Sequence, residues 1–395
     1  MRFGIVQEAY FTPGMSLQQR YLDMITEAVQ AERSGFDFYC TSEQHFGFSE
    51  GYLVDRADKY HQQKSGTVSA PESFLSYVAA RTERIRLRPT SVVLLTFNNP
   101  VRVAEWIATL DVLTDGRVEL GTARSNNLST IQAFGVVPKD TKEIWRESLE
   151  VIVKAFTEDP FSFEGRWWSF PAARTLTPKP IQKPHPPIFV SASSVATHRG
   201  AAELGLGAMT GGSIVGWQYV EEAAAAYVEA IRDAAPLPGS AVNNSLGFFA
   251  TRVNCAETAE EARAAIEQTA LAFIDINIGP GGRYEQLAPT SPDYGYLGNI
   301  REMQEHMHDL GYIMERTPYV LFGTPDFLIE KFKRLESMGY TELLLGIEGM
   351  AHEANMRAIE MLGTHVLPAF AREPETVSSI PSRSEATPSG RTPQR

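Results

Sequence analysis

Apolar residues along the chain form short runs that alternate with longer stretches of helical spacing. The short runs, rich in β-branched and aromatic residues, predict strands at 2–8, 36–41, 85–95, 117–121, 187–192, 206–210, 246–254 and 342–347. The amphipathic stretches predict helices at 16–34, 72–83, 101–113, 142–157, 196–204, 216–234, 258–273, 325–338 and 353–366. Ser16 and Thr258 stand where an N-cap is expected, and Gly35 stands where the first helix would end.

This alternation predicts a parallel sheet whose faces are covered by helices. Eight strand–helix units fit a closed (β/α)8 TIM barrel better than an open doubly wound sheet. An open dinucleotide-binding sheet would place G-x-G-x-x-G after the first strand, where this chain has Ala9-Tyr10-Phe11-Thr12-Pro13. We therefore expect a TIM barrel with long insertions.

Three stretches interrupt the rhythm, at 46–71, 161–186 and 276–317. The second contains the hairpin-like sequence FSFEGRWWSF. Long loops in compact domains are usually functional or disordered, and loops that follow barrel strands lie on the catalytic face. We expect the 46–71 insertion to shape the pocket and the segment 276–296 to close over it.

The last segment, 373–395, differs from the rest because it is dense in Ser, Thr and Pro and holds two aliphatic residues. Such a composition cannot bury enough apolar surface to offset the entropy of ordering. We expect a barrel domain over 1–372 and a disordered tail over 373–395.

Composition narrows the class of protein. The chain is 43% hydrophobic and 21% charged, with a formal net charge of −12, which argues against nucleic-acid binding. It has no run of about 18 apolar residues and no signal-peptide pattern, so no membrane span and a cytoplasmic location are expected. Cys40 and Cys255 are too few for a disulfide scaffold, and no Cys/His cluster predicts a metal site.

Polar residues follow three of the predicted strands. Glu43 and His45 follow the second and form either an acid–base pair or a structural hydrogen bond. Arg124 follows the fourth, where its planar guanidinium either holds a phosphate or makes a surface salt bridge. Ser193 and Ser194 follow the fifth, where they either bind an anion or cap the next helix. Arg124 and this serine turn together would fit one terminal phosphate.

Five ordered motifs run from Arg2 to about Pro368: MRFG, SGFDFYCTSEQHF, NNPVRVAEWIATLDVLTDGRVELGTARS, PHPPIFVSASSVATHRGAAELGLG and FGTPDFLIEKF. In this order and spacing the chain resembles the luciferase-like, flavin-dependent monooxygenases, and among them the alpha subunit of bacterial luciferase. The resemblance implies a (β/α)8 barrel that binds reduced FMN.

The resemblance also implies particular site residues. Arg124 and the serine turn match the residues that hold the FMN phosphate, and Glu43 matches an acid near the flavin. Ser91 and Val92 match a position beside the isoalloxazine where relatives place a non-prolyl cis bond. The expected cofactor-binding set is Ser91, Val92, Ala123, Arg124, Asn126, Ser193, Ser194 and Thr197.

Two departures from the luciferase subunit bear on the chemistry. Its catalytic histidine is replaced by Gln44, which cannot titrate, whereas the following histidine is kept as His45. Its reactive cysteine is replaced by Ala123. We expect Glu43, Gln44 and His45 to be the catalytic residues, and we do not expect a long-chain aldehyde substrate or light emission.

The function implied is an FMNH2-dependent monooxygenase that activates O2 as a C4a-peroxyflavin. It would oxidise a small organic substrate by Baeyer–Villiger insertion or hydroxylation, with reduced flavin supplied by a separate NAD(P)H:flavin reductase. A homodimer is expected, as is common in the family. Two alternatives remain open: hydride transfer with the deazaflavin F420, and a non-catalytic flavin-binding protein.

Overall fold

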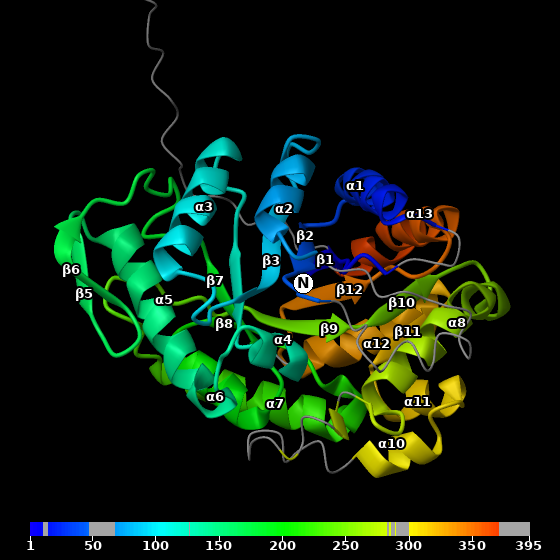
Figure 1. Cartoon of the computed structure of the whole chain (residues 1–395). Coiled ribbons are helices and arrows are strands. Elements are labelled where there is room, and N and C mark those ends of the chain that lie inside the picture. The colour runs from blue at the N-terminus through cyan, green and yellow to red at the C-terminus, as the bar shows by residue number, and fades with distance from the viewer. Residues whose placement is uncertain are drawn as a thin grey trace, which may run out of the picture.

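The fold is a closed barrel of parallel strands, which confirms the predicted (β/α)8 architecture. The computed structural model describes residues 1–10, 15–46, 68–125, 127–282, 284–285, 289 and 300–370. In this part of the chain eight strands close in the order β1-β12-β9-β8-β7-β4-β3-β2 (Figure 1). Their bounds are β1 (Arg2–Val6), β2 (Phe38–Ser42), β3 (Arg86–Val93), β4 (Leu120–Ala123), β7 (Ile188–Ala192), β8 (Gly207–Thr210), β9 (Leu246–Ala250) and β12 (Glu342–Gly346).

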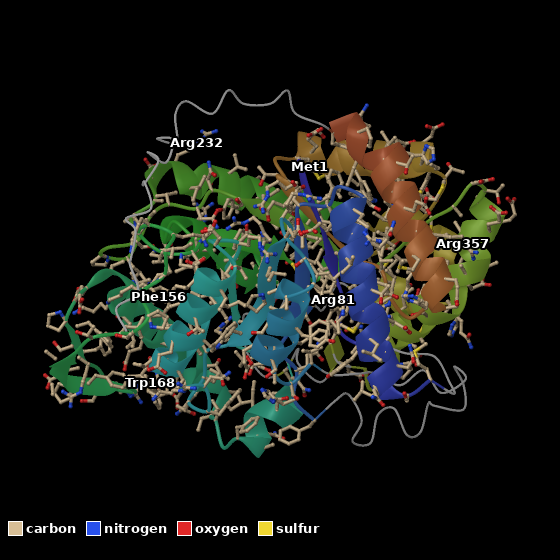
Figure 2. All side chains as sticks on the ribbon, turned by 90° about the horizontal axis from the view of Figure 1, so that it is seen from above. Met1, Arg81, Phe156, Trp168, Arg232 and Arg357 are labelled. Carbon is tan, nitrogen blue, oxygen red and sulfur yellow. The ribbon has the colours of Figure 1, made fainter. Side chains whose placement is uncertain are left out.

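Helices surround this barrel and connect its strands. They are α1 (Leu17–Arg33), α2 (Pro71–Ala79), α3 (Pro100–Leu113), α5 (Thr141–Thr157), α6 (Val195–Glu203), α7 (Trp217–Ala230), α12 (Pro325–Ser337) and α13 (His352–Met361). The expected caps are confirmed: the Ser16 hydroxyl accepts the Gln19 N–H, and Gly35 follows α1 with φ of 86°. α1 and α13 lie side by side although they come from opposite ends of the chain (Figures 1 and 2).

Short irregular turns extend several helices beyond these bounds. They comprise 3₁₀ turns at Pro138–Asp140, Ser213–Val215, Ile231–Asp233 and Leu367–Phe370, and a π turn at Leu362–Val366. The last two follow α13 directly, so the chain stays helical to Phe370 although α13 itself ends at Met361.

The single strand predicted at 246–254 is wrong. β9 ends at Ala250, and β10 (Arg252–Cys255) leaves the barrel to pair in parallel with β11 (Val320–Gly323), which the sequence reading missed. Thr251 makes the break, because both its N–H and its hydroxyl donate to the Tyr319 carbonyl. No Gly, Pro, Asn or Asp stands between Phe248 and Val253, so no turn signal in the sequence marks the change of partner.

The region after β10 is more helical than expected. α8 (Ala259–Ile278) begins with a capping box between Thr258 and Glu261 and runs past the predicted end at 273, so the start of the expected lid is helix. Three further helices were not predicted: α4 (Leu128–Ala133), α10 (Arg301–Glu305) and α11 (Leu310–Arg316). Most of 283–299, all of 47–67 and the tail 373–395 lie outside the described residues.

The hairpin predicted from FSFEGRWWSF is confirmed as antiparallel β5 (Phe161–Glu164) and β6 (Ser169–Arg174). The Glu147 carboxylate of α5 accepts the backbone N–H groups of the hairpin turn, including those of Trp167 and Trp168. The hairpin lies at the outer edge of the molecule, on the far side of α5 from the barrel (Figure 1). It therefore belongs to the scaffold and contributes nothing to the cavity described below.

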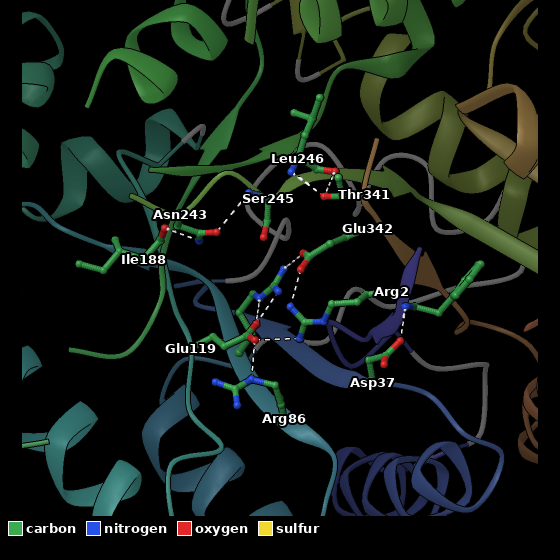
Figure 3. Close-up of polar contacts among 12 residues, drawn as sticks. Arg2, Asp37, Arg86, Glu119, Ile188, Asn243, Ser245, Leu246, Thr341 and Glu342 are labelled. Atoms are coloured by element: carbon green, nitrogen blue, oxygen red, sulfur yellow. Dashed lines mark hydrogen bonds and ion pairs between the residues drawn. The ribbon is translucent and has the colours of Figure 1, made fainter. Parts of the chain in front are cut away.

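A cluster of paired charges fills the amino-terminal end of the barrel. Arg88 is fully buried and pairs with Glu119 and Glu342, which also bind Arg2 (Figure 3). The Arg88 guanidinium also lies over the rings of Phe38 and Phe189.

Within the described ranges, no helix has the length and apolar content needed to cross a bilayer.

Candidate active site

A cavity of about 210 Å³ opens at the carboxyl ends of the barrel strands. This is the face on which barrel enzymes carry their sites, because the loops after the strands converge there. Of the residues predicted from the sequence, those that line the cavity are Glu43, Gln44, His45, Ser91, Ala123, Arg124 and Ser193. Val92, Ser194 and Thr197 do not line it, and Asn126 lies outside the described residues.

The Glu43 carboxylate is buried and fully engaged. Its Oε1 accepts from Asn98 Nδ2 and lies 2.7 Å from His45 Nε2, while its Oε2 accepts the Val93 N–H at 2.8 Å. His45 in turn lies edge-on to the rings of Phe97 and Phe134. Glu43 thus fixes the orientation of the imidazole and ties the end of β2 to the end of β3.

Gln44 contacts a carboxylate that the sequence reading did not single out. Its Nε2 donates to Oε1 of Glu8 at 2.9 Å, and the Ser42 hydroxyl donates to the same oxygen at 2.7 Å. Glu8 follows β1, lines the cavity and is 8% exposed. The position of Glu8 in the sequence could have identified it, because a charged residue that follows an apolar barrel strand lies at the catalytic end of the barrel.

The side of the cavity at which the sequence predicts a phosphate is formed where β4 and β7 end. Arg124 and Ser125 follow β4, and Ser193 follows β7 and lines the cavity beside them. The Ser194 hydroxyl accepts the Thr197 N–H at 3.1 Å and bonds the Thr197 hydroxyl at 2.8 Å, so these two residues cap α6. Backbone N–H groups in the first turn of α6 add positive potential to this side.

His198 lies behind this turn and supports it. Its Nδ1 must carry the proton that bonds the Ser194 carbonyl, since a carbonyl only accepts, and its Nε2 accepts from the Thr210 hydroxyl at 2.8 Å. The side chain is fully buried, and burial lowers the pKa of His198 to about 4, against a smaller opposing effect of the Ser194 carbonyl. His198 is therefore neutral, and its two hydrogen bonds link the ends of β7 and β8.

The cis peptide expected at Ser91–Val92 is not present. The cis bonds in the described part of the chain precede Pro160, Pro178 and Pro184. β3 instead adapts to β2 by a register shift at Thr41/Ser42, which sets Ser42 opposite Ser91.

The donors and the open space of the cavity fit a phosphorylated flavin. Arg124 is the one Lys or Arg among the described lining residues, and hydroxyls of Ser125, Ser191 and Ser193 lie on the same side. A Cβ added at Gly211 would meet only the Ala192 carbonyl, at 3.9 Å, so the wall is left open there for a ring or a chain. The described residues contain no group of three or more His, Cys, Asp or Glu able to hold a metal ion.

The fold and this site define a (β/α)8 barrel with a polar cavity at the carboxyl ends of its strands. The family model for luciferase-like monooxygenases matches residues 1–342, and the chain belongs to that family. The family predicted from the ordered motifs is therefore confirmed, and the curated relatives named below are flavin-dependent monooxygenases.

Two relatives align over most of their own length. The chain is 29% identical over 378 residues to an FMNH2-dependent dimethylsulfone monooxygenase of Pseudomonas putida, covering 92% of this chain and 94% of the relative. It is 23% identical over 401 residues to the oxygenase component of a flavin-dependent trigonelline monooxygenase of Acinetobacter baylyi, covering 96% and 100%.

Solved structures share the fold. The oxygenating constituent of 3,6-diketocamphane monooxygenase of Pseudomonas putida, a type II Baeyer–Villiger monooxygenase in complex with FMN, superposes with a TM-score of 0.71 at 21% identity, covering 93% of this chain and 98% of the other. An F420-dependent secondary alcohol dehydrogenase superposes with a TM-score of 0.67 at 16% identity, covering 94% and 99%. At these identities the likeness establishes the barrel alone.

Proposed function

We propose that the chain is the oxygenase of a two-component system that uses FMNH2 and O2 to oxidise a small organic substrate. The observation that carries the proposal is that Arg124 and Ser193, which follow β4 and β7, line the same cavity as the Glu43–His45 pair, which follows β2. The relative matched over 92% of the chain is itself FMNH2-dependent. A separate NAD(P)H:flavin reductase would supply the reduced flavin, because no nucleotide fingerprint follows the first strand.

The phosphate side would bind and orient the cofactor. Arg124 donates in a planar fork, and the hydroxyl of Ser193 together with the first turn of α6 completes an anion site. Ser194 and Thr197 would act at one remove, by fixing the start of α6. Reduced FMN supplies the electrons with which O2 is activated, and the enclosed cavity limits the access of water to the reacting atoms.

The residues that follow β2 would transfer protons to and from the substrate. Glu43 bonds Nε2 of His45, which leaves Nδ1 as the atom that exchanges a proton with the substrate. Gln44 cannot titrate, so its role is to hold the Glu8 carboxylate by a hydrogen bond. Insertion of oxygen beside a carbonyl, as in a Baeyer–Villiger reaction, and hydroxylation are both compatible with this arrangement.

The cofactor assignment is tested by comparing FMN with riboflavin, which lacks the phosphate. Wild-type protein should bind FMN at least tenfold more tightly than riboflavin, as measured by quenching of flavin fluorescence. Arg124→Ala should remove most of this preference while leaving riboflavin affinity within twofold. Arg166→Ala, which removes an exposed cation of the β5–β6 turn, is the control and should change neither affinity.

Equal affinity for FMN and riboflavin in the wild-type protein would refute the phosphate site. Titration with reduced F420 in the same assay decides between cofactors, since F420 carries an acidic tail and the charged residues in the described lining are Arg124, Glu8, Glu43 and His45 when it is protonated. Oxygen uptake coupled to product, with a reductase present, distinguishes an oxygenase from a non-catalytic flavin-binding protein. Tight FMN binding without turnover of any substrate would favour the latter.

A further inference from the structure

The charged residues that line the cavity lie at the ends of different barrel strands: Arg124 follows β4, which is separated from the strand of Glu43 by β3 alone and lies three strands from that of Glu8. Glu8 follows β1, and Ser193 follows β7, which lies four strands away from β1 in either direction around the closed sheet. Arg124 follows β4, beside β7, whereas Glu43 follows β2, beside β1. An anionic cofactor group drawn to the β4–β7 side leaves the β1–β2 side, with its two carboxylates, to face whatever else the cavity binds.

The two carboxylates at this side are held differently. Both oxygens of Glu43 accept hydrogen bonds from protein donors, so that carboxylate is fully used by the scaffold. Glu8 accepts through Oε1 alone, from Ser42 and Gln44. Its Oε2 has no hydrogen bond and no ion pair within the described ranges, although the side chain is more than nine-tenths buried at the cavity wall.

The backbone that carries Glu8 is fixed from behind. Oε2 of Glu348, in the loop after β12, accepts the N–H groups of Glu8 and Tyr10 at 2.8 and 3.2 Å. Arg252 lies 3.6 Å from the other oxygen of Glu348 and is itself fully buried. The nearby guanidinium is therefore paired with Glu348, and both donors to Glu8 are neutral and bond its Oε1, so Oε2 is left to accept from a ligand.

Aromatic rings line the same part of the cavity. Phe273 and Tyr319 line it and stack with ring centroids 5.8 Å apart, and Arg252, which pairs with Glu348, lies over the ring of Phe273. Because Arg252 already lies over Phe273 and Tyr319 stacks on it, these rings contribute an apolar wall to the pocket. A carboxylate oxygen in a pocket with an apolar wall suits a protonated amine attached to an apolar group.

We propose that Glu8 is the substrate-anchoring residue of this enzyme, and that it selects substrates with a protonated nitrogen or another strong hydrogen-bond donor. Oε2 of Glu8 accepts from the donor group, while Gln44 and Ser42 hold Oε1 in place. This rests on the proposed function, because it presumes that the β4–β7 side holds the cofactor phosphate. It also gives Gln44 a role, holding the Glu8 carboxylate, that needs no ionisable group.

The test is calorimetric titration of the flavin-free protein with three probes of matched shape: benzylamine, benzyl alcohol and benzyl methyl ether. Wild-type protein should bind benzylamine, a cation at neutral pH, at least tenfold more tightly than the ether, which cannot donate, with the alcohol in between. Glu8→Gln should lower benzylamine affinity at least fivefold and leave ether affinity within twofold. Glu8→Asp, which keeps the charge, should recover part of the preference.

Glu229→Gln, which removes an exposed carboxylate paired with Arg199 on the outside of the barrel, is the control and should retain the full preference. Equal binding of benzylamine and the ether by wild-type protein would overturn the proposal, and so would an unchanged preference in a folded Glu8→Gln variant. The wild-type comparison needs no variant, so it decides even where Glu8→Gln fails to fold. Failure to bind FMN would contradict the proposed function instead, and the amine preference could still be measured because that titration uses flavin-free protein.

Discussion

At the scale of single residues, His198 shows how a buried side chain supports the site without lining it. It bonds the Ser194 carbonyl before α6 and the Thr210 hydroxyl at the end of β8, two positions beside the proposed phosphate side. Because burial lowers its pKa to about 4, it stays neutral in the folded protein through the physiological range. Protonation would place a charge on a buried ring whose hydrogen-bond partners, the Ser194 carbonyl and the Thr210 hydroxyl, are both neutral.

This predicts a loss of stability in mild acid. The unfolded chain binds a proton at His198 near pH 6.5 and the folded chain only near pH 4, so the contribution is complete above pH 6.5. As pH falls through this window, about 3 kcal/mol of unfolding free energy should be lost. Urea denaturation of wild type and His198→Asn between pH 4 and 7 measures it.

The variant should be less stable than wild type at pH 7, because the bond to Thr210 is disturbed, yet its stability should vary less with pH. Parallel pH profiles for the two proteins would show that His198 is not the titrating group. His352 is a useful contrast because its bond to Glu27 raises its pKa, so its contribution is present below pH 6.5 and lost as pH rises.

At the scale of elements, β3 and β4 approach each other closely just below the cavity. A Cβ added at Gly121 would lie 2.3 Å from the Pro89 carbonyl oxygen and 2.7 Å from that of Thr90, both rigid backbone atoms. Gly121 directly precedes the strand end that carries Ala123 and Arg124. The absence of a side chain at Gly121 thus sets the width of the barrel wall beside the proposed phosphate site.

Gly121→Ala should therefore force these strands apart. We expect a loss of about 1–3 kcal/mol of unfolding free energy together with weaker FMN binding, since Arg124 would shift with β4. Gly200→Ala is the matched control, because its added Cβ meets nothing within 4 Å inside α6. That substitution should stabilise the protein by about 0.5–1 kcal/mol.

Thermal unfolding followed by circular dichroism compares the two alanine variants directly. Equal effects of the two substitutions would contradict the packing argument, because both add the same methyl group to a glycine. A destabilised Gly121→Ala protein that kept full FMN affinity would show that the position of β4 does not control the phosphate side.

At the scale of the whole molecule, the amino-terminal end of the barrel depends on buried charge. Burial alone would raise the pKa of Glu119, but Arg88, Arg2 and Arg86 outweigh it and hold that pKa well below its usual range. Since the folded pKa is depressed, the stability this gives is present above the unfolded value, near pH 4.3, and is lost as pH falls below it.

Arg88→Leu should cost about 3–5 kcal/mol of unfolding free energy, because it leaves two buried carboxylates short of a partner. Arg166→Leu breaks an exposed pair with Glu143 and should cost less than about 1 kcal/mol. Chemical denaturation at pH 7 measures both. A loss at Arg88 no larger than at Arg166 would mean that the cluster adds nothing to the closure of the barrel.

The homodimer expected from the sequence stays a prediction. Val112 and Leu113 at the end of α3 are exposed apolar residues. Light scattering of the full chain gives its mass in solution, and a monomer at micromolar concentration would contradict the expectation.

Much of the fold was readable from the sequence because its signals are local. The alternation of apolar runs and amphipathic helices predicted all eight barrel strands, and cap residues such as Ser16 and Thr258 marked helix starts. The split at Thr251 was not readable, because it depends on the distant carbonyl of Tyr319 and not on the pattern of the run. The same limit explains why β11 and the short helices α10 and α11 before it were missed.

The sequence by itself determined the barrel, the family and the polar residues that the strand ends would carry, since hydrophobic period and motif order are properties of neighbouring residues. Only the tertiary structure decided how those residues are used. In the folded chain both oxygens of Glu43 accept hydrogen bonds, whereas Oε2 of Glu8 accepts none at the cavity wall. Ser194 caps α6, and Gln44 donates to the Glu8 carboxylate. These roles depend on hydrogen bonds between strand ends that are far apart in the sequence and become neighbours when the barrel closes.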